Sequence, residues 1–161
     1  MIRQLESQIT AGETGWPDEL FLFVSRITPL INVDLLIRDD RGRTLLTWRS
    51  DRFHGPGWHV PGGIIRFKET AADRIRIVAA GELGVPVAFD AAPIFVQESI
   101  APQRHDRGHF ISLLYMCRLA GALDPQRQHL PGAPMPGQWA WHDGCPDNLI
   151  PEQAAYAAFM E

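Results

Sequence analysis

The chain has 161 residues, of which 45% are hydrophobic and 21% charged, a mixture typical of a globular protein rather than a disordered or fibrous one. Its 15 Lys and Arg against 19 Asp and Glu give a net charge of −4, so no nucleic-acid partner is expected. The apolar runs are far shorter than the roughly 18 residues that a membrane span requires. We therefore expect one domain over residues 1–161 that neither binds nucleic acid nor enters a membrane.

The cysteines and the N-terminal segment indicate the cellular compartment in which the protein works. Cys117 and Cys145 lie far apart with no partner spacing for zinc, and residues 1–10 contain no apolar signal core. These features predict a reduced, cytoplasmic setting. Residues 1–15 are polar and are expected to form a loose arm, or an arm that docks on a partner subunit.

The first half of the chain predicts a helix followed by a hairpin. Residues 17–27 (PDELFLFVSRI) combine Pro and two acidic residues in the first turn with an apolar face, which favours a short helix. Residues 30–38 and 43–49 are rich in branched and aromatic side chains around a DDRG turn, which is typical of paired strands. The Gly/Pro-rich run over 52–63 excludes a helix.

The second half alternates helical and strand patterns. Apolar side chains at helical spacing predict a helix over 69–83 that ends at Gly84, with Glu69 capping its start. Further predicted segments are strands over 92–98, 109–119 and 138–142, a long surface loop over 120–137 and a closing helix over 151–160. This order predicts an α/β fold with a mixed sheet between helices.

Residues 57–85 (GWHVPGGIIRFKETAADRIRIVAAGELGV) contain the most informative motif. They resemble the Nudix box, G-x5-E-x7-R-E-U-x-E-E-x-G-U, where U is a bulky apolar residue. The matching positions are Gly63, Glu69, Glu82, Gly84 and Val85. The resemblance implies a Nudix-type α/β/α sandwich.

Three positions depart from the box and bear on the metal. Ile77, Val78 and Gly81 stand where the pattern has Arg, Glu and Glu. A full box lines one helix face with three carboxylates, because residues four apart share a face. Here only Glu82 remains, so we expect one Mg²⁺, completed by a backbone carbonyl of Gly62 and by substrate phosphates.

One branch of the Nudix superfamily lacks the same carboxylates, and the chain resembles it from about residue 27 to 141. This branch, GDP-mannose mannosyl hydrolase, cleaves the sugar C–O bond of a nucleotide-sugar. The resemblance rests on a TPL-plus-strand opening that contains Asp34, on Arg49, on Glu82 before Leu-Gly, and on Gln128-His129 before a Trp-containing strand. It implies a homodimer that releases sugar and nucleoside diphosphate by attack of water on the anomeric carbon.

The resemblance also implies roles for individual residues. His129 would be the base and Asp34 would assist it, both as catalytic residues, and an imidazole suits that task near neutral pH. Arg49 and Gly63 would bind the substrate. The metal ligands would be Glu82, Gln128 and Gly62.

Two arginines of that branch are missing, because Ile64 and Ile77 occupy their positions. Other cations could replace them, with Arg66, Arg74 and Arg76 as the nearest in sequence. Two alternatives stay open. The first is a conventional Nudix pyrophosphohydrolase to which Glu98 or Asp106 contributes from outside the box. The second is a module that binds a nucleotide-sugar without cleaving it.

Overall fold

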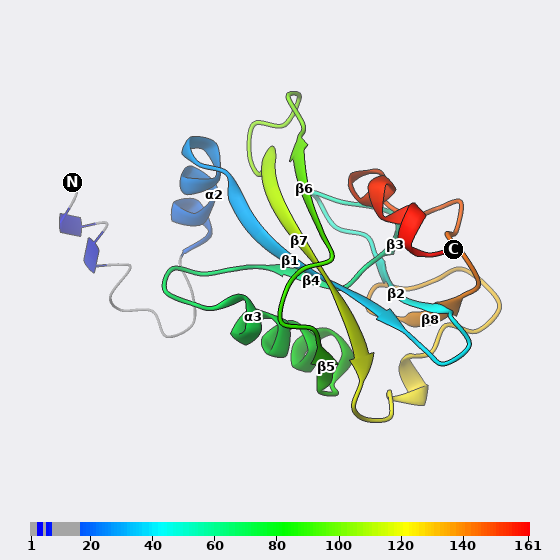
Figure 1. The fold of residues 1–161 in the computed structure, drawn as a ribbon. Coiled ribbons are helices and arrows are strands. Elements are labelled where there is room, and N and C mark those ends of the chain that lie inside the picture. The colour runs from blue at the N-terminus through cyan, green and yellow to red at the C-terminus, as the bar shows by residue number, and fades with distance from the viewer. Residues whose placement is uncertain (1–2, 5, 8–16) are drawn as a thin grey trace.

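A computed structural model describes residues 3–4, 6–7 and 17–161 (Figure 1). The predicted N-terminal arm over 1–15 lies mostly outside these residues. Within the described part of the chain, no helix is both long enough and apolar enough to cross a bilayer.

The fold is built on a mixed sheet of eight strands whose centre is a long parallel pair. Strands β1 (Leu30–Arg38) and β7 (His109–Leu119) pair from Leu30 opposite Phe110 to Ile37 opposite Cys117. Shorter antiparallel strands border them: β4 (Gly62–Ile64) and β2 (Thr44–Arg49) along β1, β6 (Phe95–Ile100) and β5 (Val87–Phe89) along β7, and β3 (Gly57–His59) and β8 (Trp139–His142) along β2.

Helices cover both faces of this sheet. Helix α3 (Ala71–Val78), continued by a π-turn η1 (Ala79–Leu83), packs on the face that buries Val33, Leu35 and Ile37 of β1. Since successive side chains of a strand point to opposite faces, Leu36 lies on the other face, against the 3-10 helix η3 (Pro151–Phe159). The predicted α/β/α sandwich with a mixed sheet is therefore confirmed.

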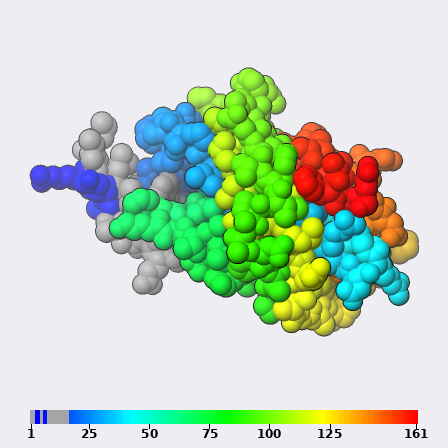
Figure 2. Space-filling model, in the orientation of Figure 1, coloured from blue at the N-terminus to red at the C-terminus, as the bar shows by residue number. Residues whose placement is uncertain are grey.

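The remaining elements complete the ends of the sandwich. Helix α2 (Asp18–Ile27) precedes β1, and a single 3-10 turn η2 (Pro125–Arg127) lies in the long loop before β8. The C-terminal segment, red in the space-filling view, borders the green segment around β6 (Figure 2). Contacts between Gln97 Nε2 and the Glu152 carbonyl at 3.3 Å, and between the rings of Phe95 and Tyr156, join β6 to η3.

The predicted helices, hairpin and long strands are confirmed, and the differences are local. The structure adds the short strands β4 and β5, and the closing helix is of the 3-10 type. The prediction that Glu69 caps α3 is wrong. The N-cap is Thr70, whose hydroxyl accepts a hydrogen bond from the Asp73 amide at 3.1 Å, and Glu69 instead pairs with Arg74 at 2.7 Å.

Candidate active site

The site lies beside β1, at the point where its pairing partner along one edge changes from β4 to β2. Strand β4 pairs with β1 from Asn32 to Asp34, whereas β2 pairs with it only at Ile37 and Arg38. Gly62 stands opposite Asp34, and a Cβ at this position would lie 2.1 Å from Asp34 Oδ1. Only glycine therefore lets this carboxylate lie against the backbone of β4.

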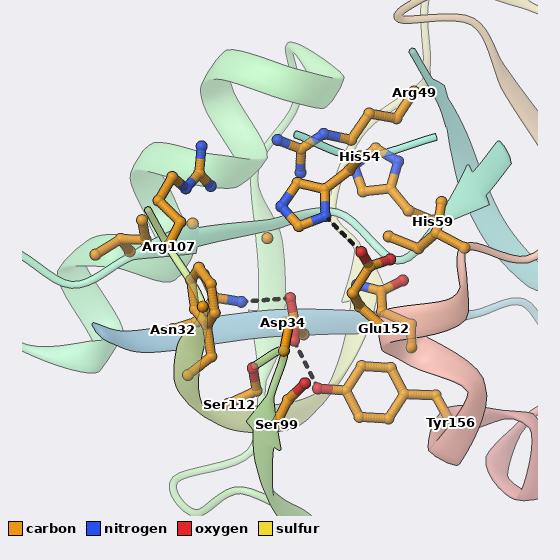
Figure 3. Close-up of a pocket in the computed structure, with 18 of the residues that line it drawn as sticks. Asn32, Asp34, Arg49, His54, His59, Ser99, Arg107, Ser112, Glu152 and Tyr156 are labelled. Carbon is orange, nitrogen blue, oxygen red and sulfur yellow. Dashed lines mark hydrogen bonds and ion pairs between the residues drawn. The ribbon is translucent and has the colours of Figure 1, made fainter. Parts of the chain in front are cut away.

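Two adjacent cavities open at this edge. The first, here called the Asp34 cavity, has a volume of about 180 Å³ and is lined by polar side chains from β1, β6, β7 and η3 (Figure 3). The second, the Glu82 cavity, lies toward the π-turn that follows α3. Both are lined by Arg49, His59 and Gly62, so one ligand could span them.

Asp34 forms the floor of the first cavity. It is buried, and its carboxylate accepts hydrogen bonds from Tyr156 Oη at 2.6 Å and Asn32 Nδ2 at 2.7 Å. Burial disfavours the charged form and raises the pKa of Asp34 to about 6, although both hydrogen bonds act in the opposite direction. A carboxyl group that titrates in this range is suited to proton transfer near neutral pH.

Glu82 projects from the π-turn into the second cavity. Its carboxylate accepts hydrogen bonds from the Gly62 amide at 3.3 Å and from Thr47 Oγ1 at 3.4 Å, and His59 Nε2 lies 3.5 Å from it. The side chain is about one-third exposed. The carboxylate is thus oriented by the strand edge and still open to a ligand.

The two positions where the Nudix box has a carboxylate and this chain does not, Val78 and Gly81, lie in different environments. Val78 belongs to the hydrophobic core under α3, where a carboxylate would be desolvated. Gly81 faces open space, since a Cβ there would meet no atom within 4 Å. Among the described residues, no three His, Cys, Asp or Glu side chains are grouped to hold a metal. Within this described part of the chain, Glu82 can therefore contribute to a site for a single divalent cation, and the donors do not fit a cluster of ions.

Two of the arginines that line the Asp34 cavity lie in a polar loop for which the sequence predicted no role. Arg104 and Arg107, from the loop between β6 and β7, line this cavity together with Arg49 and His54. Burial, and next the charge of Arg49, lower the pKa of His54 to about 4, so this imidazole is neutral at physiological pH. The positive charge therefore comes from the arginines.

The arginines expected to replace the missing cations are not all available. Arg74 is bound to Glu69, and Arg76 to Asp73 at 3.2 Å, and neither lines either cavity. Ile64 lines the Asp34 cavity, but Ile77 lies half-exposed on α3. Replacement by these two arginines is therefore wrong.

The structure brings together five of the seven predicted site residues. Asp34, Arg49, Gly62 and Gly63 line the Asp34 cavity, and Glu82 lines the neighbouring one with Arg49 and Gly62. Gly63 is needed for close packing, because a Cβ there would lie 2.7 Å from Val78 Cγ2.

Gln128 and His129 lie elsewhere, and among the described residues that line the two cavities neither is present. Gln128 forms a backbone bridge with Trp139. The His129 ring is half-buried and packs edge-on against Trp58, with centroids 5.5 Å apart. The roles suggested for both residues stay predictions.

Comparisons with known proteins agree with this architecture. A family model described as the NUDIX domain matches residues 28–143. The low-salt glycan biosynthesis protein Agl8 of Haloferax volcanii is 37% identical over 85 residues, 53% of this chain and 54% of that protein. The match thus spans about half the length of that curated relative.

Solved structures are similar in fold at low identity. A MutT NUDIX hydrolase from Burkholderia pseudomallei is similar with a TM-score of 0.58 and 21% identity, over 83% of this chain and 96% of that one. A possible asymmetric diadenosine tetraphosphate hydrolase from Jonesia denitrificans is similar with a TM-score of 0.60 and 21% identity, over 84% and 98%. At such identities the likeness concerns the fold alone.

Proposed function

The chain belongs to the NUDIX family of hydrolases, and from that premise we propose that it hydrolyses a nucleotide-sugar similar to GDP-mannose, releasing the sugar and the nucleoside diphosphate. The observation that carries the proposal is that two acidic side chains, Glu82 and Asp34, line different but adjoining cavities. The α3 side offers Glu82 alone, whereas a buried Asp34 that titrates near neutral pH lies in the adjoining cavity. Attack on phosphorus depends on clustered metal ions, and attack on the sugar carbon depends on a base near that carbon.

In this reaction the oxygen of water forms a bond to the anomeric carbon while the bond from that carbon to the phosphate oxygen breaks. The bonding electrons leave with the nucleoside diphosphate, and Asp34 accepts the proton of the water. Arg49 lines both cavities, and we expect its guanidinium to hold negative charge on the leaving group. Direct displacement by one water inverts the anomeric configuration.

We include one Mg²⁺ in the proposal. NUDIX hydrolases generally use divalent metals, and Glu82 is a carboxylate of the second cavity that no arginine pairs with, unlike Asp51. When bound, the ion would neutralise charge on the diphosphate. A backbone carbonyl of Gly62 is the further protein ligand that the family resemblance implies.

Asp34 is our candidate for the base because it lies in the cavity and His129 does not. Glu98 and Asp106, the alternatives for a pyrophosphohydrolase, lie outside both cavities and pair with His109 and Arg26. The homodimer and the cytoplasmic setting stay predictions.

Product analysis tests the proposal. We expect purified protein with Mg²⁺ to convert GDP-mannose into mannose and GDP in equal amounts, without GMP or mannose 1-phosphate. Release of GMP would support a pyrophosphohydrolase instead. Binding of GDP without turnover of any nucleotide-sugar in a panel would support a binding module.

A further inference from the structure

The loop over 101–108 carries two arginines to the mouth of the Asp34 cavity and is fixed on both sides. Its ends are joined by the Ala101 amide, which donates to the Gly108 carbonyl at 2.7 Å. Arg104 donates to the Phe53 carbonyl at 2.6 Å and is paired with Glu152. The backbone of this loop is also tied to α2, through a hydrogen bond from the Arg107 amide to Ser25 Oγ at 3.1 Å.

Arg107 differs from the neighbouring arginines because, among the described residues, no carboxylate forms an ion pair with it, although the charge of Asp51 acts on it from farther away. Arg49 is paired with Asp51 and Arg104 with Glu152. In the described part of the chain, the Arg107 guanidinium makes no hydrogen bond or ion pair, and its Nε is buried without a partner. A buried donor without an acceptor is unfavourable, and an anion in the cavity would satisfy it.

Aromatic rings hold this guanidinium in place. Its central carbon lies 4.6 Å from the centroid of the Phe53 ring and 5.9 Å from that of Phe110, which suits cation–π contacts. Figure 3 shows Arg107 and Arg49 near His54, with Asp34 below them. Burial and the charge of Arg49 lower the pKa of Arg107 to about 10, so the group is still charged at neutral pH.

We propose that Arg107 is the anion-binding residue of the Asp34 cavity and that its ligand is the diphosphate of the substrate. A planar guanidinium held by aromatic rings can bind phosphate oxygens in pairs without first losing side-chain freedom. Ile64 lines the same cavity and supplies no charge there. The inference rests on the proposed function for the identity of the ligand.

Calorimetric titration with inorganic pyrophosphate and with GDP tests the proposal. Arg107→Gln is expected to weaken binding of both ligands by about 10-fold to 100-fold, the usual range for a hydrogen bond to a charged group. Arg107→Lys retains the charge and is expected to weaken binding by less. Arg76→Gln removes one positive charge outside both cavities and is the matched control, with unchanged affinity expected.

Thermal unfolding of each variant shows whether the fold persists, and Arg107→Lys keeps the test valid if Arg107→Gln unfolds. Equal affinity of wild type and folded Arg107 variants for pyrophosphate would overturn the proposal. An equal loss in Arg76→Gln would also overturn it, since the effect would then be one of net charge. Dependence on Arg107 with pyrophosphate but not with GDP would remove the assignment to a nucleoside diphosphate.

These outcomes are separable from the proposed function because pyrophosphate contains no sugar. If pyrophosphate and GDP binding depend on Arg107 but no nucleotide-sugar is cleaved, the anion site stands and the hydrolase proposal fails. If GDP-mannose is cleaved and substitution of Arg107 does not change binding of pyrophosphate or GDP, the hydrolase proposal stands and the anion site fails.

Discussion

Glu82→Gln is expected to lower turnover of the nucleotide-sugar by about 10²–10³, the usual cost of removing one charge-stabilising group from an active site. The substitution removes the charge of Glu82, which lines the second cavity together with Asp51, and Asp51 is already paired with Arg49. The amide oxygen can still accept the hydrogen bond from the Gly62 amide, so the fold should persist. Initial rates measured against Mg²⁺ concentration check the prediction, and the variant should require far more metal for half-maximal activity.

Glu98→Gln is the matched control for this experiment. Glu98 is largely exposed on β6 and lies outside both cavities, so removing its charge should change neither turnover nor metal dependence. Identical Mg²⁺ dependence of wild type and Glu82→Gln would contradict the metal role. A loss of turnover in Glu98→Gln would instead favour the pyrophosphohydrolase.

Asp34→Asn is expected to lower turnover by about 10²–10⁴, the range typical of a positioned general base. A base works in its ionised form, and the pKa of Asp34 is raised to about 6. The wild-type rate should therefore rise as pH increases through about 6, and the variant should lose this rise. Tyr156→Phe removes a hydrogen bond that lowers this pKa, so the rise should move to higher pH. A pH–rate profile of each protein provides the measurement.

His129→Ala distinguishes the two candidates for the base. Its ring contacts Trp58 and lies outside both cavities, so we expect the rise of the wild-type pH profile to persist in this variant. The opposite pattern would contradict our assignment: a rise that is absent in His129→Ala and present in Asp34→Asn. That result would restore the role implied by the family resemblance.

The elements that the sequence predicted well are those whose signal is local and repeated. Helical spacing of apolar residues marked the segment that ends at Gly84, and branched residues on either side of a turn marked the β1–β2 hairpin. Strand β5, with three residues, is too short to show a period. The π-turn at Ala79–Leu83 is a change of hydrogen-bond register, to which side-chain periodicity is insensitive.

The sequence predicted only those site residues that occupy a recognisable position in a motif or interrupt a local pattern. Asp34 interrupts an apolar strand and Glu82 occupies a box position, and both line the cavities. Arg107 lies in a polar loop, and its role depends on rings of Phe53 and Phe110 that reach it from other segments. A contact between residues so far apart in the chain leaves no spacing pattern.

His129 is the converse case, because a motif suggested a role for a side chain that lies outside both cavities, and that role stays a prediction. The Gln128-His129 pair was identified by its neighbours in sequence. The side-chain direction, however, is set by the backbone bridge between Gln128 and Trp139 and by packing on Trp58. These tertiary contacts cannot be read from two adjacent residues.

Turnover of GDP-mannose in water enriched in ¹⁸O tests the central claim most directly, because it reports which atom the water attacks. If water attacks the anomeric carbon, mass spectrometry will find the heavy oxygen in the released mannose and none in GDP. Direct displacement also requires that the α-linked sugar first appear as the β anomer in a rapid NMR time course. Heavy oxygen in a phosphate product would contradict the account and would assign the chain to phosphorus–oxygen cleavage.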